Sequence, residues 1–327
     1  MKCFYHVDQD GIVSGFYVRK ACEQRGLAFE PEDFRKINYG MKFPFHDIEQ
    51  DEFVFIVDYS IEPEEMWQLL SITKNVFWID HHQSTIEAYK DFKCDVKGIR
   101  ITGAGISGAN LTWLYFKYMC DENWEQIERT DEKNVKRLLN IYKYKADYPK
   151  LAEYTAMWDT FYFGETSKQF VKAFHYAFES YDFDALSPLL NTLNKDQGIY
   201  EAAKIIGDMI ADGLSIIEYL AANAEQYLRA YGFETIFEGH KVYAINRALI
   251  NSDFFESIDA SKYDMFIGFS FNGSMWEYQL RSAEQDKVNV YELAVKYGGG
   301  GHPNAAGFRS EKYVLGCLLY TSDAADE

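Results

Sequence analysis

The chain has 327 residues, of which 47% are hydrophobic and 17% aromatic, and its formal net charge is −18. This length and composition predict a folded protein with two domains, each with its own core. A long nucleic acid is bound mainly through Lys and Arg side chains that meet its phosphates, and the chain has no Lys- or Arg-rich run. We therefore expect no long nucleic acid as a partner.

Local composition argues against other protein classes. No run of about 18 apolar residues is present, so we expect neither a transmembrane helix nor a membrane partner. Asp8 and Asp10 stand where an export signal would need an apolar stretch. The five cysteines show no paired spacing, which is typical of free thiols in a cytoplasmic protein. A homodimer is one of the oligomeric states that stay open.

Strands and helices alternate at the start of the chain. Strands are expected at 2–8, 52–60 and 75–80, and helices at 11–26 and 62–72. The strands are nearly continuous apolar runs, as is typical of strands that are buried on both faces. This alternation predicts a parallel, doubly wound sheet.

The pattern becomes helical from about residue 107 to about residue 180, and a long helical stretch at 198–231 predicts a connector between two lobes. Four further elements follow, with strands at 240–246, 263–272 and 275–282 and a helix at 289–297. The turn residues Asn272, Gly273 and Ser274 predict that the last two strands form a hairpin.

The predicted fold is therefore α/β, with a parallel-sheet domain over 1–185, a helical connector over 186–231 and a smaller α/β domain over 232–316. The last eleven residues, 317–327 (CLLYTSDAADE), back-translate codon by codon into a transposase-adapter sequence. We expect this tail to derive from the adapter and not from the natural protein.

Acids and histidines gather where the three N-terminal strands end. They are His6, Asp8 and Asp10 after the first strand, Asp58 after the second, and Asp80, His81 and His82 after the third. Because the carboxyl ends of parallel strands meet at one edge of a sheet, we expect these side chains to share a pocket. Carboxylates that lie so close repel one another, and divalent cations would resolve the conflict. Mixed His and Asp ligands suit manganese, iron or zinc better than calcium.

Each of these features alone has an ordinary structural explanation. His6 could be a hydrogen-bonding residue, Asp58 could cap the following helix, and the adjacent histidines could lie in a surface turn. Their occurrence at three successive strand ends favours a two-metal site, which would activate a water and hold a phosphoryl group.

The motifs HVDQDG, VDYS and IDHH, in this order, resemble those of the DHH phosphoesterase superfamily. The segment GGGGHPNAAGF, preceded by YQLRS, resembles the DHH-associated C-terminal domain of the nano-RNase and cyclic-dinucleotide phosphodiesterase branches. The resemblance extends from about residue 2 to about residue 310. It implies a metal-dependent phosphodiesterase with a DHH domain over 1–185 and a DHH-associated, substrate-binding domain over 232–316.

The resemblance also implies ligands for two divalent metal ions, for which manganese is expected and magnesium, cobalt or iron are alternatives. His6 and Asp8 would bind one ion and Asp10 the other, and Asp58 would bridge both. His81 would be a further ligand.

Four more residues complete this implied centre. Asp80 and His82 would support the metal ligands or face the phosphate, so that with His81 they form the catalytic motif. The fourth motif is a single aspartate, for which Asp159 in MWDTF is favoured and Asp147 in KADYP is the rival.

The glycine segment would contribute the substrate-binding wall. Glycines allow close approach of the backbone, so that N–H groups can face a phosphate. The residues assigned to substrate binding are Arg281, Gly299, Gly300, Gly301 and His302. His46, His175 and His240 lack such a context and are assigned to structure or surface.

The expected function is the hydrolysis of short oligonucleotides or of dinucleotides, linear or cyclic, to mononucleotides, in a cleft between the lobes. Short RNA, cyclic di-AMP and pAp all stay open as substrates. The spacing His6-x-Asp8-x-Asp10 departs from the His-x-x-x-Asp-x-Asp of many nano-RNase relatives and resembles the single-strand exonuclease branch, which is one alternative. The other is a nucleotide-binding regulator that has lost catalysis. A family II pyrophosphatase fits less well, since its C-terminal domain lacks the glycine-histidine signature.

Overall fold

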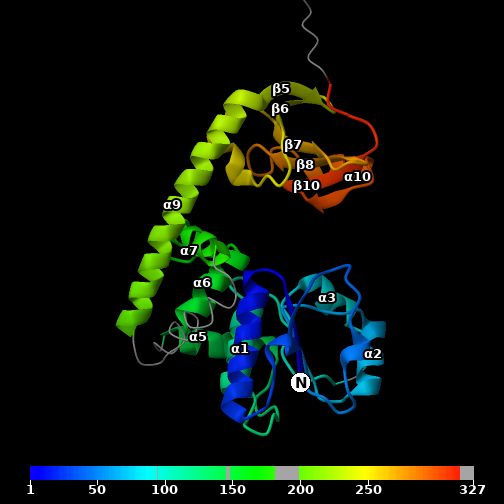
Figure 1. Ribbon diagram of the computed structural model, residues 1–327, viewed down its shortest axis with the longest axis vertical. Helices are drawn as coiled ribbons and strands as arrows, with labels where there is room; N and C mark the ends of the chain where they lie inside the picture. The colour runs from blue at the N-terminus through cyan, green and yellow to red at the C-terminus, as the bar shows by residue number, and fades with distance from the viewer. Residues whose placement is uncertain (94, 145–147, 181–198, 317–327) are drawn as a thin grey trace, which may run out of the picture. The chain divides into compact units, whose positions relative to one another are not determined.

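The computed structural model describes residues 1–93, 95–144, 148–180 and 199–316 (Figure 1). The chain divides into two compact units, Met1–Ile216 and Ile217–Glu327. Asp147, the tail 317–327 and the first part of the predicted connector lie outside the described residues. None of the described helices combines the length and the apolar character that a membrane span requires.

The first unit is built on a four-stranded sheet in which all neighbouring strands are parallel. In the spatial order β2-β1-β3-β4, its strands are β1 (Lys2–His6), β2 (Phe34–Ile37), β3 (Val54–Val57) and β4 (Val76–Ile79). The sequence predicts β1, β3 and β4, but it misses the edge strand β2. Arg35 and Lys36 interrupt the short apolar run of this strand, which is largely unburied.

Helices cover both faces of this sheet (Figure 1). They are α1 (Gln9–Arg25), α2 (Pro63–Ile72), α3 (Gln83–Ala88), α4 (Gly108–Leu114), α5 (Glu132–Tyr144), α6 (Lys150–Asp159) and α7 (Lys168–Ser180). Short turns lie at η1 (Pro31–Asp33), η2 (Phe45–Asp47) and the π-helical η3 (Tyr115–Met119).

Two separate cores follow from the alternation of side chains along the strands. Phe55 and Phe77 belong to the core that includes α1 and α4, whereas Ile56 and Trp78 belong to the core that includes α2. The prediction of a doubly wound parallel sheet is confirmed.

The first helix shows how the sequence positions the site. Asp8 is its N-cap and accepts a hydrogen bond of 3.0 Å from the N–H of Gly11. Gly26 ends the helix in the left-handed conformation, with a φ of 67°, which glycine adopts without strain. The predicted end of the helix is confirmed, and its start at Gln9 places Asp10 in the first turn.

The second unit contains a mixed six-stranded sheet of order β5-β6-β7-β8-β10-β9, in which only β6 and β7 are parallel neighbours among the described residues. Its strands are β5 (Gly232–Phe237), β6 (His240–Asn246), β7 (Met265–Phe271), β8 (Trp276–Ser282), β9 (Gly300–His302) and β10 (Ala305–Ser310). Its helical elements are α10 (Val290–Lys296), η4 (Ser252–Phe255) and η5 (Ala260–Lys262). The long helix α9 (Ile199–Tyr231) contains the boundary between the two units.

The predicted hairpin is confirmed, because β7 and β8 pair antiparallel around a turn in which Gly273 has a φ of 99°. α10 packs on one face of this sheet, and η4, η5 and the last turn of α9 pack on the other. The α/β class of the second unit is therefore also confirmed, although the sequence does not predict β5, β9 or β10.

Candidate metal centre

The first strand ends in a histidine that contacts two carboxylates. The Nδ1 atom of His6 lies 2.7 Å from Oδ2 of Asp8 and 3.9 Å from Oδ2 of Asp58. Its Nε2 atom lies 3.3 Å from the side-chain oxygen of Asn38, which follows β2. The hydrogen bond with Asp8 raises the pKa of His6 above its ordinary value.

Asp10 is buried, and the first turn of α4 holds its carboxylate. Its two oxygens accept hydrogen bonds from the N–H groups of Gly108, at 2.6 Å, and Ala109, at 2.9 Å. Only glycine fits at position 108, because a Cβ atom there would lie 2.5 Å from the Cβ of Asp58. The helix terminus thereby fixes Asp10 next to Asp58.

Asp58 follows β3 and is only 1% exposed. Its φ of 53° lies in the left-handed region, which Asp tolerates better than most residues and which is enriched at functional sites. The next helix starts at Pro63 with Glu62 as its N-cap, so the alternative explanation of Asp58 as a helix cap is wrong. Neither carboxylate oxygen of Asp58 has a hydrogen-bond partner.

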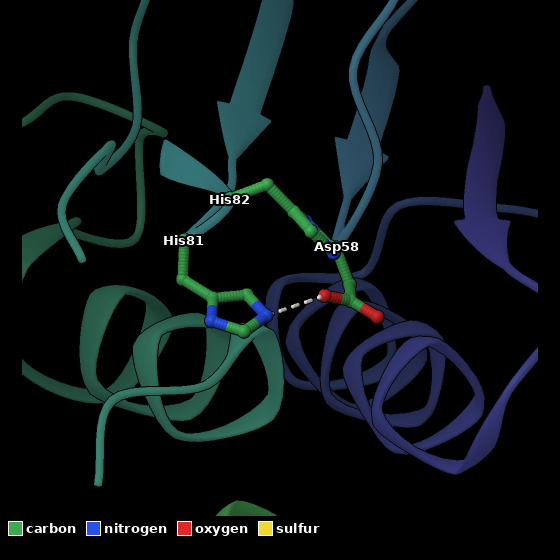
Figure 2. A group of neighbouring side chains, drawn as sticks. All are labelled: Asp58, His81 and His82. Carbon is green, nitrogen blue, oxygen red and sulfur yellow. Dashed lines mark ion pairs between the residues drawn. The ribbon is translucent and has the colours of Figure 1, made fainter. Parts of the chain in front are cut away.

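His81 follows β4 and points its Nε2 atom into a group of carboxylates. This atom lies 3.2 Å from Oδ1 of Asp58, 3.5 Å from Oδ2 of Asp10 and 3.4 Å from Oδ2 of Asp159. Figure 2 shows the side chains of His81 and Asp58 turned toward each other from the ends of neighbouring strands. Asp159 is the last residue of α6.

The third-motif residues Asp80 and His82 form a support for this group. Asp80 is fully buried, and its Oδ1 atom accepts a hydrogen bond of 2.7 Å from the N–H of His81 and lies 2.7 Å from Nδ1 of His82. Its Oδ2 atom accepts hydrogen bonds from the hydroxyls of Ser60 and Thr85.

Both oxygens of Asp80 are thus occupied by partners from the protein. Burial by itself would raise the pKa of Asp80, but the hydrogen bond with His82 and its charge hold that pKa below its usual range. The same bond raises the pKa of His82. Asp80 therefore orients the two histidines, and it belongs to none of the groups of donor atoms that could hold a metal ion.

The electrostatics of the remaining carboxylates are unfavourable without a cation. Burial, together with the charges of Asp10 and Asp8, raises the pKa of Asp58 well above its usual range and that of Asp159 to about 8. Four buried atoms of this group have no hydrogen-bond partner: both Oδ atoms of Asp58, Nε2 of His81 and Oδ2 of Asp159. Buried polar groups without partners are costly, and a metal ion would satisfy all four.

The donor atoms form three overlapping groups, and in each group they lie within 4.8 Å of one another. The groups are His6, Asp8 and Asp58; Asp10, His81 and Asp159; and Asp58, His81 and His82. Nitrogen and carboxylate donors of this kind fit manganese, iron or zinc. Asp58 belongs to two of these groups, and its Oδ1 atom lies 3.2 Å from Nε2 of His81, which is a member of the third. The residues therefore fit two neighbouring ions that share this carboxylate.

The substrate-binding residues expected in the second unit also come together. Ala305 pairs with Arg281 on one side and with His302 on the other, so these three side chains share one face of the sheet. The guanidinium of Arg281 donates to the carbonyls of Leu280, at 2.9 Å, and Ile250, at 3.2 Å. His302 is exposed.

The glycines next to this row have two different functions. A Cβ at Gly299 would lie 2.1 Å from the carbonyl oxygen of Gly307, and Gly301 has a φ of 138°, so the backbone requires glycine at both positions. Gly300 has open space around its Cα. Because glycine has no side chain, the backbone at Gly300 is accessible beside His302.

Sequence reasoning misses a hydrogen-bonded network behind the centre. Gln9, which stands between Asp8 and Asp10 in the sequence, is buried. Its Nε2 atom donates a hydrogen bond of 3.0 Å to the hydroxyl of Thr155, and its Oε1 atom lies 2.7 Å from Nδ1 of His175. Burial lowers the pKa of His175 to about 4, so a neutral ring donates this bond. The partners are 146 and 166 residues apart in the chain, and no local pattern signals them.

Solved structures resemble the chain over nearly its whole length. PggH, a pGpG-specific phosphodiesterase from Vibrio cholerae, is 12% identical, with 95% of this chain and 93% of that chain covered and a TM-score of 0.51. An exopolyphosphatase-related protein from Bacteroides fragilis is 14% identical, with coverages of 95% and 86% and a TM-score of 0.45. RecJ from Thermus thermophilus in complex with Mn²⁺ is 15% identical, with coverages of 94% and 49% and a TM-score of 0.43.

No family model and no curated protein matches the chain. The likeness to the pGpG-specific phosphodiesterase shows the fold. This fold agrees with the one that the motifs predict, a parallel α/β domain followed by a smaller α/β domain.

Proposed function

We propose that this protein is a metal-dependent phosphodiesterase that hydrolyses short oligonucleotides or dinucleotides, linear or cyclic, to mononucleotides. The observation that carries the proposal is the set of four buried donor atoms without partners, on Asp58, His81 and Asp159. A structural cluster would satisfy these atoms with hydrogen bonds from the protein. Their orientation toward one another is instead suited to cations and a phosphate.

His6, Asp8 and Asp58 would hold one divalent ion, and Asp10, His81 and Asp159 the other, with Asp58 shared. When bound, two such ions lower the pKa of the attacking water and neutralise charge on the phosphoryl oxygens. We propose manganese, because imidazoles and carboxylates are mixed in the donor set. Magnesium, cobalt and iron are the alternatives.

The protein's own side chains contribute orientation. The N–H groups of Gly108 and Ala109 keep Asp10 in place, and Asp80 fixes the ring of His82 through its Nδ1 atom. The side chain of His82 is 33% exposed, compared with 12% for His81. We therefore assign His82 to contact with the scissile phosphate and His81 to the metal.

The second unit would recognise the remainder of the substrate through Arg281, His302 and the backbone of Gly299–Gly301. This assignment goes with the proposed division into a DHH domain over 1–185, a connector over 186–231 and a substrate-binding domain over 232–316. The thiols of Cys3, Cys22 and Cys120 are free, which supports a cytoplasmic location.

The test combines metal binding with a substrate panel. Purified protein with Mn²⁺ would be offered labelled RNAs of two to ten nucleotides, cyclic dinucleotides, pAp and the generic ester bis-p-nitrophenyl phosphate. We expect turnover of the generic ester and of the shortest substrates, and its loss in Asp58→Asn. Asp91→Asn, a change at an exposed aspartate, is the matched control.

Three outcomes would contradict parts of the proposal. Tight binding of metal and nucleotide without turnover of any substrate would favour the regulator that has lost catalysis. Progressive degradation of long single strands would favour the exonuclease. Full activity of Asp58→Asn would exclude the metal centre as the site of hydrolysis.

A further inference from the structure

The turn after α6 carries an aromatic residue in an unusual backbone conformation. The helix ends at Asp159, Thr160 is its C-cap, and Phe161 follows with a φ of 50°. The N–H of Phe161 still donates to the carbonyl of Trp158, at 3.3 Å. The first residue beyond a helix is often left-handed, but it is then usually a glycine. A bulky side chain is strained in this conformation.

Burial does not compensate for this strain, because the Phe161 side chain is 64% exposed. The next residue, Tyr162, is 51% exposed. A single exposed aromatic residue is ordinary. Phe161 combines an exposed aromatic ring with a strained conformation two positions after a candidate metal ligand, and strain of this kind is concentrated at functional sites.

Phe161 is the most exposed ring of an aromatic array, in which it also meets the ring of Phe163 edge-on, with ring centres 6.2 Å apart. Its ring centre lies 5.5 Å from that of Trp158, and the planes meet at 35°. Trp158 in turn stacks on His175, with ring centres 4.2 Å apart and planes at 19°. His175 is held by its hydrogen bond with Gln9. The array therefore runs from the network behind the metal centre out to solvent, and each inner ring limits the movement of the next.

The turn is also in contact with the segment that precedes α4. A Cβ atom at Gly105 would lie 3.1 Å from the ring of Tyr162, so the turn lies against the loop before α4. This loop leads to Gly108 and Ala109, whose N–H groups donate to Asp10. An aromatic surface on this turn is thus fixed relative to both Asp10 and Asp159.

We propose that Phe161, supported from behind by Trp158, is a stacking platform for a nucleobase of the substrate. The inference rests on the proposed function and specifies it: the substrate carries a base next to the scissile phosphate. Stacking on an aromatic ring accepts any base, because every base has a π-face. The platform would favour esters that carry a base over generic phosphodiesters without selecting one sequence.

The test measures binding rather than turnover. Calorimetry on the Mn²⁺-loaded protein would compare guanosine 5′-monophosphate with ribose 5-phosphate, which has the same phosphate and sugar but no base. In Phe161→Gly we expect binding of the nucleotide to weaken about 5- to 150-fold, the range for one stacked base. Binding of ribose 5-phosphate should change less than about twofold, and Phe161→Trp should restore nucleotide binding.

Two further arms separate the platform from fold and chemistry. Since glycine relieves the backbone strain, the Tm of Phe161→Gly should stay equal or rise by about 2 °C; a marked fall would show that the ring is structural and would overturn the proposal. The matched control is Phe271→Ala, because Phe271 is 53% exposed and its ring centre lies 5.3 Å from that of Trp276. This control should leave nucleotide binding unchanged.

The outcomes distinguish the platform from the proposed function. If Phe161→Gly binds the nucleotide as tightly as the wild type, the platform is wrong, even if the generic ester is hydrolysed. If the wild type hydrolyses no ester but Phe161→Gly still weakens nucleotide binding selectively, the proposed hydrolysis fails and the platform stands. Equal weakening for nucleotide and ribose 5-phosphate would assign Phe161 to the metal centre and overturn base stacking.

Discussion

Without bound ions, the stability of the protein should fall as the pH rises from about 4 to about 8. The reason is Asp159, whose pKa is raised from 3.8 to about 8 by burial and by the charges of Asp10 and Asp8. Between these two values the folded protein keeps a proton that the unfolded chain has lost. Because the folded state then binds more protons, each additional pH unit lowers the free energy of unfolding.

The size of the effect follows from the same values. About three pH units separate the ordinary aspartate pKa of 3.8 from pH 7, and each unit changes the free energy of unfolding by about 1.4 kcal/mol. Asp159 should therefore lower the free energy of unfolding by about 4 kcal/mol at pH 7 relative to pH 4. The side chain is 24% exposed, and contact with water makes this an upper value. Asp159→Asn removes the titrating proton with little change in shape, so it should flatten the slope by up to about 1.4 kcal/mol per pH unit.

The assay is urea unfolding at pH 5, 6, 7 and 8 with EDTA, followed by the same series with Mn²⁺. The exposed Asp91→Asn serves as the control for a lost carboxylate. With Mn²⁺ the slope should reverse in the wild type, since cations bind the ionised carboxylates. Equal slopes for the wild type and Asp159→Asn in EDTA would refute the reasoning.

Four other predictions follow from the site. Asp58→Ala should lose both ions by elemental analysis, whereas Asp8→Ala should keep about one; unchanged metal content in Asp58→Ala would exclude the bridging role. Arg281→Ala should lower kcat/KM for a dinucleotide about 10- to 150-fold, mainly through KM, but hardly for the generic ester, and equal losses would exclude substrate recognition by this residue. Gly108→Ala should weaken Mn²⁺ binding in calorimetry, because its Cβ would displace Asp58; unchanged affinity would mean that the backbone there can shift freely. His175→Phe keeps a ring beside Trp158 but loses the hydrogen bond to Gln9, so the affinity for Mn²⁺ should fall several-fold. An unaltered affinity would mean that the hydrogen bonds of Gln9 only stabilise the fold.

The sequence predicts the parts of the fold in which local pattern and tertiary environment agree. β3 and β4 are apolar throughout and buried on both faces, so their pattern alone identifies them. β2 and β9 are different. β2 contains two adjacent basic residues, and β9 (Gly300–His302) contains two glycines, so both become strands because a neighbouring strand pairs with them. Such pairing is set by the whole fold and leaves no local signal.

The candidate site divides in the same way. His6, Asp58 and His81 follow strands that can be predicted, and the rule for parallel sheets predicts that they converge. Asp159 comes from the end of a helix, and only the resemblance to a known family singles it out. The sequence alone gives no reason to single out Phe161, because its positive φ and its exposed ring are visible only in the structure.

The geometry also links metal binding to the stability of the first unit. The proposed ligands come from four elements: Asp10 from the start of α1, Asp58 from the end of β3, His81 from the end of β4 and Asp159 from the end of α6. Without ions, these elements are held together against the repulsion of buried carboxylates. With ions at a hundredfold excess over Kd, linkage adds about 2.7 kcal/mol for each site that only the folded state provides. The centre therefore destabilises the metal-free fold and stabilises the loaded one, and the resulting difference in stability measures occupancy without any substrate.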